Sequence, residues 1–292
     1  MNKGPVNKNV NFIGIGTVKS ATTWIYNCLN SHPQIAMPAI KEVKFFNKKE
    51  NIKLGIDWYL NHFQNPDKIQ GEYTARYIYD DVASKIKTFF PDTKLIICLR
   101  NPVERAFSHY QYAKNKGNET CVNFESAIRR RDDYVKWGKY YKYLKPYYDL
   151  FPHENIKVII FEDIKVQPQK VITDLYGFLG VDKNFIPDSL HKKSNVTEKI
   201  AYKFIHLNIA ISKIKIWLRA QKHGYLVLYG IKKIGLNKIA TRLIAANSKK
   251  MSHDNSSKEQ MDEIMRSKLK KYYLEDICQL EKLISRNLSQ WK

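Results

Sequence analysis

The stretch Phe12-Ile13-Gly14-Ile15-Gly16-Thr17-Val18-Lys19-Ser20-Ala21-Thr22-Thr23-Trp24 decides the fold. It begins with a continuous apolar run, which is typical of a strand buried on both faces of a parallel sheet. A loop of small residues with one lysine follows, and two hydroxyl residues then open a helix. Backbone N–H groups and the helix dipole favour an anion at such a point, so the stretch predicts a phosphate-binding loop.

The same stretch departs from two common nucleotide-binding motifs. The pattern GxxxxGK[ST] does not fit, because Val18 precedes Lys19 where that pattern needs a glycine. The pattern GxGxxG fails because no glycine follows Gly16 at the third position. Taken alone, the segment is therefore also compatible with an ordinary strand, turn and helix that carry an exposed lysine.

A second segment favours the anion site. The strand-like run Lys94–Leu99 leads directly into Arg100, and Ser108 lies two turns into the helix expected to follow. An arginine at the carboxyl end of a parallel strand points into the crevice where open α/β sheets bind their ligands. The guanidinium fork of Arg100 and the hydroxyl of Ser108 together suit one phosphate group.

The rest of the chain alternates between short apolar runs and helical patterns, which predicts an α/β fold with a central parallel β-sheet flanked by helices. Four strands are expected at Val10–Ile15, Ile69–Tyr73, Lys94–Leu99 and Lys157–Phe161. Helices are expected at Thr23–Asn30, Ile56–Phe63, Asp81–Phe89, Val103–Lys114, Tyr140–Phe151 and Pro168–Leu179. The C-terminal part is expected to be helical, and it ends in one long amphipathic helix over Gln260–Ile284.

Composition narrows the classes of protein further. The 292 residues allow one large or two small domains, and 43% hydrophobic residues exclude a wholly disordered chain. Four cysteines without regular spacing support neither a disulfide scaffold nor a zinc site. The formal net charge of +22 favours an anionic partner, although a lysine-rich solvated surface explains it equally well.

The segment from Glu198 to about Lys250 is rich in lysine and in aliphatic residues at helical spacing. Two interpretations stay open: helices that pack on the main sheet, or a basic amphipathic surface that contacts an anionic membrane peripherally. No stretch approaches the length of a membrane span, and Met1–Asn11 lacks the apolar core of a signal peptide. We therefore expect a cytoplasmic protein, with peripheral contact at the inner membrane face as an open alternative.

At this point the sequence resembles the sulfotransferases that use 3′-phosphoadenosine-5′-phosphosulfate (PAPS). It is most similar to the bacterial and Golgi carbohydrate branch, which includes the heparan sulfate N- and 3-O-sulfotransferases. Beyond the two anion motifs, the resemblance continues through Lys41–Phe46, Gly55–Tyr59, Gly71–Thr74, Ile159–Asp163, Phe178–Gly180 and Arg286–Trp291. It covers nearly the whole chain, which favours a single domain over residues 1–292 with a helical insertion at about 198–250.

The resemblance implies a donor site and a reaction. Arg100 and Ser108 would hold the 3′-phosphate of PAPS, or of the product 3′,5′-bisphosphoadenosine (PAP). Lys19 would stabilise the charge that develops on the departing phosphate. A lysine of the segment 247–260 would close over the nucleotide, with Lys258 favoured over Lys249 and Lys250 by its distance from the last helix. The 5′-phosphosulfate would lie against the loop formed by Lys19, Ser20, Ala21, Thr22, Thr23 and Trp24.

The resemblance also assigns the general base to Glu42, in the motif Lys41-Glu42-Val43-Lys44-Phe45-Phe46. Without it, this segment would be interpreted as a solvated surface turn, and Glu72 and Glu162 are the next carboxylates to consider. Two departures stand out. Tyr73 occupies the place where heparan sulfate 3-O-sulfotransferases carry a catalytic lysine, and Lys44 replaces a histidine of some relatives.

The implied reaction is in-line transfer of the sulfuryl group from PAPS to a hydroxyl or amine of a carbohydrate or small metabolite, with no metal. Two alternatives remain. A phosphate-loop kinase would need a complete glycine-rich loop and a carboxylate for Mg²⁺, for which Asp163 is the candidate. A non-catalytic polyanion- or RNA-binding protein would explain the charge, but no nucleic-acid-binding module is recognisable, so no specific nucleic acid is expected.

Overall fold

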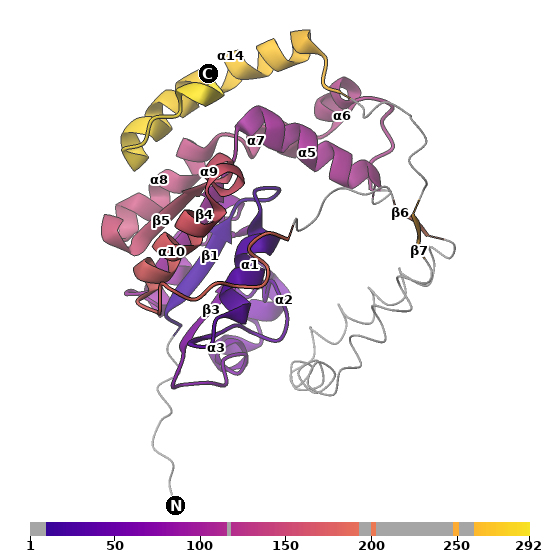
Figure 1. Cartoon of the computed structure of the whole chain (residues 1–292). Helices are drawn as coiled ribbons and strands as arrows, with labels where there is room; N and C mark the ends of the chain where they lie inside the picture. The colour runs from indigo at the N-terminus through magenta and orange to yellow at the C-terminus, as the bar shows by residue number, and fades with distance from the viewer. Residues whose placement is uncertain (1–9, 116–117, 193–199, 203–247, 251–259) are drawn as a thin grey trace, which may run out of the picture.

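The computed structural model describes residues 10–115, 118–192, 200–202, 248–250 and 260–292. Its centre is a sheet of five parallel strands in the spatial order β2-β3-β1-β4-β5 (Figure 1). The strands are β1 (Phe12–Gly16), β2 (Ile35–Ala36), β3 (Ile69–Tyr73), β4 (Lys94–Leu99) and β5 (Ile156–Ile160). The predicted α/β fold with a central parallel sheet is therefore confirmed.

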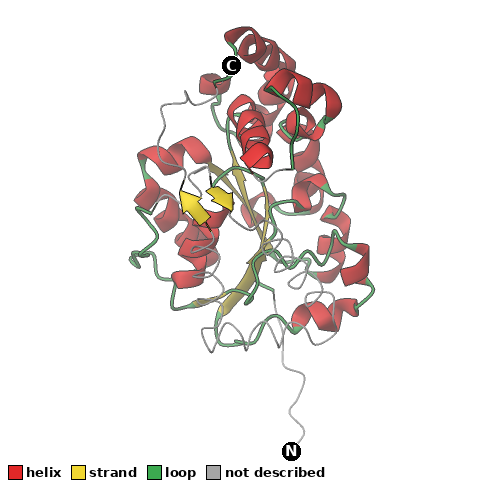
Figure 2. Ribbon diagram, turned by 90° about the vertical axis from the view of Figure 1, so that its right-hand side faces the viewer, coloured by secondary structure: helices red, strands yellow, loops and turns green. Residues whose placement is uncertain are grey.

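Helices connect the strands and lie on both faces of the sheet, as the view turned by 90° shows (Figure 2). The part of the chain up to Asn115 contains α1 (Thr22–Ser31), α2 (Lys49–Ile52), α3 (Gly55–Leu60), the 3₁₀ turn η1 (Tyr77–Tyr79), α4 (Ala83–Phe89) and α5 (Pro102–Asn115). After it come α6 (Phe124–Arg130), α7 (Asp133–Lys136), α8 (Tyr140–Leu150), η2 (His153–Asn155), α9 (Phe161–Val166) and α10 (Pro168–Leu179). The described chain ends with α14 (Glu263–Ile284) and η3 (Ser289–Trp291).

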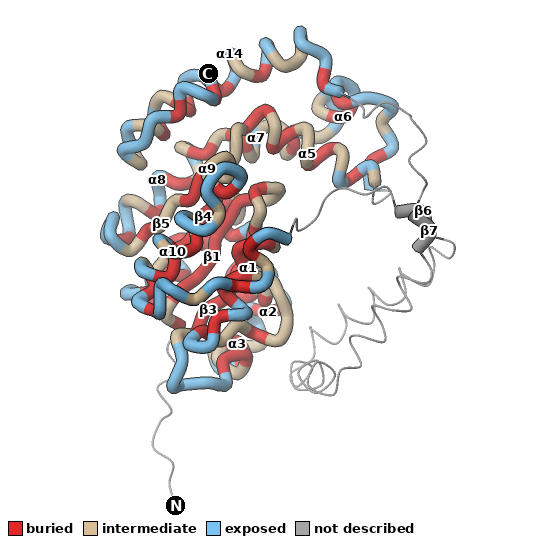
Figure 3. The backbone as a smooth tube through the Cα atoms, viewed as in Figure 1, coloured by how far each residue is buried: buried red, intermediate tan, exposed pale blue. Residues whose placement is uncertain are grey.

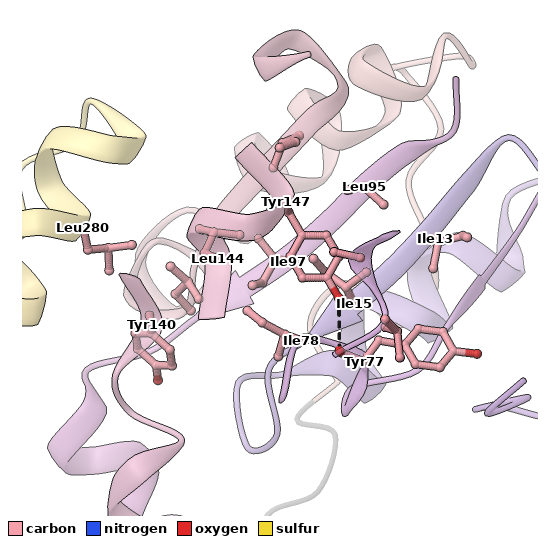
Figure 4. Close-up of a cluster of buried hydrophobic side chains, with 14 of the residues drawn as sticks. Ile13, Ile15, Tyr77, Ile78, Leu95, Ile97, Tyr140, Leu144, Tyr147 and Leu280 are labelled. Carbon is pink, nitrogen blue, oxygen red and sulfur yellow. Dashed lines mark hydrogen bonds between the residues drawn. The ribbon is translucent and has the colours of Figure 1, made fainter. Parts of the chain in front are cut away.

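Successive side chains of each strand point to opposite faces of the sheet. Because helices cover both faces, both sets of side chains are buried. Ile13 and Ile15 of β1 join Leu95 and Ile97 of β4 in a core that α8 covers (Figure 4). In that core, the hydroxyl of Tyr147 donates a hydrogen bond to the Tyr77 carbonyl oxygen over 3.0 Å. The opposite core contains Phe12, Ile96 and Cys98 with residues of α1 and α10. This double burial explains the continuous apolar runs of the strands (Figure 3).

One glycine of β1 is required by its neighbour in the sheet. Gly14 pairs with Tyr73 of β3, and a Cβ atom added at Gly14 would lie 2.2 Å from the Tyr73 ring. The fully buried tyrosine crosses over the strand, and its hydroxyl donates to the carbonyl oxygen of Gly16 over 2.6 Å. Tyr73 therefore supports the end of β1, where the predicted anion loop begins.

Two helix ends follow their sequence signals. The side-chain oxygen of Asn101 accepts hydrogen bonds from the N–H groups of Val103 and Glu104, and Pro102 begins α5, as the Asn-Pro pair predicts. Gly180 follows α10 with a φ of 78°, a left-handed conformation that glycine adopts without strain. The first of these ends orients α5 immediately after Arg100.

The C-terminal helix α14 forms an outer layer that packs on α8 and α5 (Figure 1). Leu269, Tyr273, Ile277 and Leu280 form its buried stripe, which agrees with the predicted amphipathic helix. Arg266 forms an ion pair with Glu104 of α5, so α14 is attached to the helix that follows β4. The face of α14 that points away from the core is exposed (Figure 3).

The structure differs from the predicted elements in several places. The pattern did not predict β2, α2, α6, α7 or α9, and the last of these begins at Phe161, directly where β5 ends. Within the segment predicted to be helical, residues 200–202 and 248–250 form β6 (Ile200–Tyr202) and β7 (Ser248–Lys250), which pair antiparallel. The rest of that segment lies outside the described residues. Among the described helices, none is both long and apolar enough to span a bilayer.

Candidate active site

The predicted anion loop lies between β1 and α1, next to the carboxyl end of β4. The backbone N–H and the hydroxyl of Thr17 both donate to the Cys98 carbonyl oxygen, over 3.0 Å and 2.8 Å. The Thr17 and Ser20 hydroxyl oxygens lie 2.7 Å apart, and both residues are fully buried. The Ser20 N–H also donates to the Thr17 carbonyl oxygen over 3.3 Å, so both the hydroxyl and the N–H of Ser20 are used within the loop and fix its shape.

Lys19 and Ala21 both adopt left-handed backbone conformations, with φ values of 71° and 56°. Such conformations are costly for residues with a Cβ atom and persist only where the surroundings impose them. Alternation of right- and left-handed residues turns successive N–H groups to one side, which creates a concave site for anions. The ammonium group of Lys19 lies over the ring of Tyr112 from α5, 4.1 Å from its centroid.

Arg100 directly contacts this loop. Its guanidinium donates a hydrogen bond to the Lys19 carbonyl oxygen over 3.2 Å, and it lies 4.6 Å from the ring centroid of Phe161. The Tyr140 hydroxyl donates to the Arg100 carbonyl oxygen over 2.8 Å, which fixes the end of β4. Burial lowers the pKa of Arg100 from its ordinary value, opposed by nearby acidic groups such as Glu104. The buried Nε–H of Arg100 has no hydrogen-bond partner among the described residues, so the guanidinium retains a donor for an anion.

Ser108 lies on the same face of α5 as Tyr112, because residues four apart in a helix are neighbours. Tyr112 is the residue beneath the Lys19 ammonium group, so the half-buried Ser108 lies one turn closer to Arg100 along the same face. The described hydrogen bonds do not join Ser108 to Arg100 directly. The predicted pair therefore borders the loop from two elements, the end of β4 and the second turn of α5.

Of the side chains in the first turn of α1, some border the anion loop and others pack in the core. Thr22 is buried, and Thr23 is half-buried with its hydroxyl accepting a hydrogen bond from the Lys41 ammonium group over 3.1 Å. Trp24 is only 5% exposed, and its indole N–H donates to the Leu190 carbonyl oxygen over 3.1 Å. Its side chain therefore packs in the core under α1, and this burial disfavours a direct contact of the indole with a nucleotide.

Glu42 follows β2 in a segment that returns to the anion loop. Its carboxylate lies 3.2 Å from the Lys44 ammonium group and 4.0 Å from that of Lys41, and its side chain is 26% exposed. Lys41 in turn contacts Thr23 at the start of α1. Burial lowers the pKa of Lys41, while Glu42 opposes that shift. Lys41 thereby joins the carboxylate to the anion loop, a role that its sequence motif did not reveal.

The two alternative carboxylates have different surroundings. Glu72 is 1% exposed at the end of β3, and burial raises its pKa to about 7 although several hydrogen bonds oppose the shift. Glu162 accepts a hydrogen bond from the Asn101 backbone N–H over 3.1 Å, which ties α9 to the start of α5. Glu72 is closed to an acceptor by its burial, while Glu162 is half-buried and already bonded to the start of α5, so Glu42 stays the candidate base.

Two further expectations concern lysines. Tyr73 stands where the resemblance to heparan sulfate 3-O-sulfotransferases would place a lysine, and its side chain is fully buried against Gly14, so no cation extends from this position. Lys258 lies outside the described residues. Lys249 and Lys250 lie in β7, where they pair with Ala201 and Ile200, respectively. Among the described residues, no group of three His, Cys, Asp or Glu side chains is arranged to hold a metal ion.

Comparison with known proteins decides the family. The family model described as the sulfotransferase domain matches residues 11–208, which is more than half of the chain. The chain belongs to the sulfotransferase domain family. The matched residues contain the anion loop, Glu42, Arg100 and Ser108.

Individual relatives agree with this assignment. The domain is 37% identical over 137 residues to the membrane-associated sulfotransferase kil1 of Dictyostelium discoideum, covering 43% of this chain and 29% of that protein. It is 27% identical over 195 residues to the human bifunctional heparan sulfate N-deacetylase/N-sulfotransferase 3, covering 58% of this chain and 22% of that protein. The chain thus spans less than a third of the length of these curated relatives.

A solved structure supports the fold. The sulfotransferase domain matches the crystal structure of a sulfotransferase from Alicyclobacillus acidocaldarius with a TM-score of 0.67 and 24% identity. The match covers 96% of this chain and 98% of the other. At this identity the comparison establishes the shared architecture of sheet and helices.

Proposed function

We propose that this domain transfers a sulfuryl group from PAPS to a hydroxyl or amine of an acceptor. The S–O bond to the 5′-phosphate would break as a new S–O or S–N bond forms. The acceptor proton would pass to Glu42, and 3′,5′-bisphosphoadenosine would leave. The observation that carries the proposal is the junction of Arg100, the Lys19 loop and the Glu42 segment at one edge of the sheet.

The donor site follows from the two anion-binding elements. The N–H groups of the loop and the start of α1 suit the 5′-phosphosulfate, because helix N-termini attract anions. Arg100 and Ser108 suit the 3′-phosphate, since a guanidinium with a remaining N–H donor forms strong charge-assisted hydrogen bonds. A nucleotide with phosphates at both positions would engage both elements, which distinguishes PAPS from ATP.

Lys19 would act on the charge that develops as the sulfuryl group leaves. Negative charge grows on the oxygen that bridges sulfur and phosphorus, and a cation already in place stabilises it without reorganisation. Lys19 lies in the loop itself, and its backbone is held by Arg100. Positioning and electrostatics would therefore supply most of the rate enhancement.

Glu42 would accept the acceptor proton. Its carboxylate is partly exposed, so an acceptor has access, and Lys41 links it to Thr23 beside the donor loop. The Lys41 and Lys44 ammonium groups lie 4.0 Å and 3.2 Å from this carboxylate. A general base of this kind typically contributes 10²–10⁴-fold to the rate.

The acceptor is proposed to be a carbohydrate, with a small metabolite as the alternative. The heparan sulfate N-deacetylase/N-sulfotransferases among the relatives support a polysaccharide. Lys41 and Lys44 give the mouth of the site a positive field, which suits an acceptor with acidic groups. A kinase is disfavoured because Asp163, the candidate Mg²⁺ ligand, forms an ion pair with Arg286 over 3.0 Å.

The test combines binding and turnover. We expect 3′,5′-bisphosphoadenosine to raise the melting temperature of the domain and ATP with Mg²⁺ to leave it unchanged. With ³⁵S-labelled PAPS, label should pass to a de-N-sulfated heparan acceptor or to a hydroxyl-bearing polysaccharide. Protection by ATP with Mg²⁺ alone would favour the kinase, and salt-sensitive polyanion binding without any nucleotide effect would favour a non-catalytic protein.

A further inference from the structure

We propose that Glu72 is a positioning residue that holds Glu42 in its reactive place through the backbone of the next residue. The carboxylate of Glu72 accepts a hydrogen bond from the Val43 N–H over 3.3 Å. This inference rests on the proposed role of Glu42 as general base. It assigns a function in turnover to a carboxylate that no acceptor can reach, because Glu72 is 1% exposed.

The end of β3 provides two adjacent anchors for the Glu42 segment. The Thr74 hydroxyl donates to Glu72 Oε2 over 2.7 Å, and it also accepts a hydrogen bond from the Lys44 N–H over 3.4 Å. Glu72 and Thr74 therefore hold the N–H groups of the two residues that follow Glu42. Since β3 pairs with β1, these anchors fix the segment to the same sheet that carries the anion loop.

The Glu42 segment needs such anchors because its backbone is strained. Glu42 and Lys44 have φ values of 61° and 60°, left-handed conformations that are costly for residues with a Cβ atom. The conformation persists only where surrounding contacts impose it. Asn51 provides the contacts on the other side, because its amide donates to the carbonyl oxygens of Val43 and Lys44.

Four donors surround the Glu72 carboxylate, which matches the capacity of two carboxylate oxygens. The hydroxyls of Tyr59 and Tyr77 donate to Oε1 over 3.2 Å and 2.7 Å, while Thr74 and the Val43 N–H donate to Oε2. Hydroxyls can rotate to accept a hydrogen bond, but a backbone N–H can only donate. The acceptor at Oε2 is thus the feature that the Glu42 segment requires from residue 72.

Three substitutions differ in the acceptors that they leave for the Glu42 segment. Glu72→Gln retains an acceptor for Val43, because its amide oxygen can take the Oε2 position while the tyrosine hydroxyls rotate to accept from its NH₂ group. Glu72→Leu has a similar volume and removes every acceptor. Thr74→Val removes the hydroxyl that supports both Glu72 and the Lys44 N–H, and it leaves the carboxylate in place.

The experiment is a double-mutant cycle with Glu42. We expect Glu72→Leu to lower kcat by about 10²-fold, the effect of a reacting group displaced by about 1 Å, and Glu72→Gln to retain most of the turnover. The affinity for 3′,5′-bisphosphoadenosine should change less than about twofold, since the anion loop is untouched. In a Glu42→Gln background, Glu72→Leu should cause no further loss, because a residue that acts through Glu42 has nothing left to position.

Glu119→Gln is the matched control. Glu119 is also a buried carboxylate with several donors, including the Tyr134 hydroxyl and the N–H groups of Thr120 and Cys121, but it lies beyond the far end of α5. Glu119→Gln should lower the melting temperature and leave kcat within about twofold of the parental value, as expected for a substitution that affects stability alone. If Glu72→Leu does not fold, Thr74→Val provides the same cycle.

The outcomes separate the two proposals. Equal losses from Glu72→Leu in the parent and in the Glu42→Gln background would overturn the positioning role while leaving Glu42 as the base. A kcat loss in Glu119→Gln as large as that in Glu72→Leu would also overturn it, because general destabilisation would then account for both. Parental turnover in Glu42→Gln alone would remove the base assignment, and the positioning role with it.

Discussion

The Arg100 guanidinium donates a hydrogen bond to the backbone carbonyl oxygen of Lys19 over 3.2 Å. The two residues are separated along the chain by every element from α1 to β4, yet each belongs to one of the two predicted anion motifs. Their contact exists because β1 and β4 are neighbours in the sheet and both end at the same edge. The proposed donor site is thus held together by contacts within the protein, which would reduce the cost of ordering it when a nucleotide binds.

Arg100→Ala is expected to weaken binding of 3′,5′-bisphosphoadenosine by about 2 kcal/mol or more, because a charge-assisted fork to the 3′-phosphate is lost. Arg100→Lys keeps the charge but not the fork, and it should recover only part of the affinity. Isothermal titration calorimetry with the bisphosphate and with its 3′-dephosphorylated analogue measures the effect. Equal affinity of the parent protein for the two nucleotides would remove Arg100 and Ser108 from the 3′-phosphate site.

The control for this prediction is Arg129→Ala. Arg129 forms an i,i+4 ion pair with Glu125 on the exposed face of α6, where such pairs contribute little to stability. Its loss should leave nucleotide affinity unchanged. A loss of affinity as large as that in Arg100→Ala would indicate that net positive charge, rather than a specific phosphate contact, governs binding.

Lys19→Ala is expected to lower kcat by about 10²–10³-fold with saturating donor, as removal of a preorganised electrostatic contact typically does. The melting temperature should change little, because Lys19 is half-buried in a loop and its contact with Tyr112 is at the edge of the core. Single-turnover measurements with labelled PAPS separate the chemical step from product release. An unchanged rate would mean that Lys19 serves only to shape the loop.

His109 provides a prediction on stability and pH. It is 8% exposed, stacked on Trp137 at 5.2 Å, and its Nδ1 has no hydrogen-bond partner among the described residues. Burial, reinforced by the charge of Arg105, lowers the pKa of His109 to about 3 from an ordinary value of 6.5. Between these two pH values the unfolded chain therefore binds more protons than the folded one. The contribution of His109 to the free energy of unfolding is fully present above pH 6.5 and is lost as the pH falls below it.

The measurement is denaturant unfolding of the parent and of His109→Phe between pH 4 and pH 8. The parent should lose up to about 1.4 kcal/mol per pH unit from this one group below pH 6.5, and the difference between the two proteins should follow that slope. His153→Gln is the control, because His153 is exposed on η2. Parallel curves for the parent and His109→Phe would show that His109 is not buried in its neutral form.

Much of the fold was predictable because the strands are buried on both faces. The runs at Ile69–Tyr73 and Lys94–Leu99 were predicted with the bounds of β3 and β4, since a continuous apolar run of this length is typical of a strand in a parallel sheet. β2 has only two residues and carries no pattern of its own. α9 begins at Phe161 without an intervening loop, so the sequence pattern extended the strand β5 by one residue.

The place of the candidate site in the fold was predictable where a motif lies within one segment of the chain. Lys19 and Arg100 each follow a buried strand, and that position alone places them at the ligand-binding edge of the sheet. Glu72 was considered only as a second candidate base, because its partners come from α3, η1 and the Glu42 segment, and no local pattern reveals such a set. Trp24 was assigned to the donor site as part of a motif, yet its side chain packs in the core.

Glu42→Gln tests the base directly. Glutamine has the size and the hydrogen-bonding capacity of glutamate but does not accept a proton, so it separates chemistry from structure. We expect a 10²–10⁴-fold loss of kcat, as is typical when a general base is removed, with donor affinity and melting temperature nearly unchanged. The left-handed backbone at residue 42 is equally strained with either side chain, so folding provides no reason for a loss.

Glu50→Gln is the matched control for this last substitution, since Glu50 is an exposed carboxylate in the first turn of the short helix α2, a few residues beyond the Glu42 segment. It alters the same charge in the same region, so a general electrostatic effect on an acidic or basic acceptor would appear in both variants. Proton transfer to Glu42 predicts a loss in Glu42→Gln alone. Because Lys41 and Lys44 lose their carboxylate partner in that variant, the KM for the acceptor is measured separately from kcat. Near-parental turnover of Glu42→Gln on the acceptor would place the base elsewhere, and Glu162 would then be the next accessible carboxylate to replace.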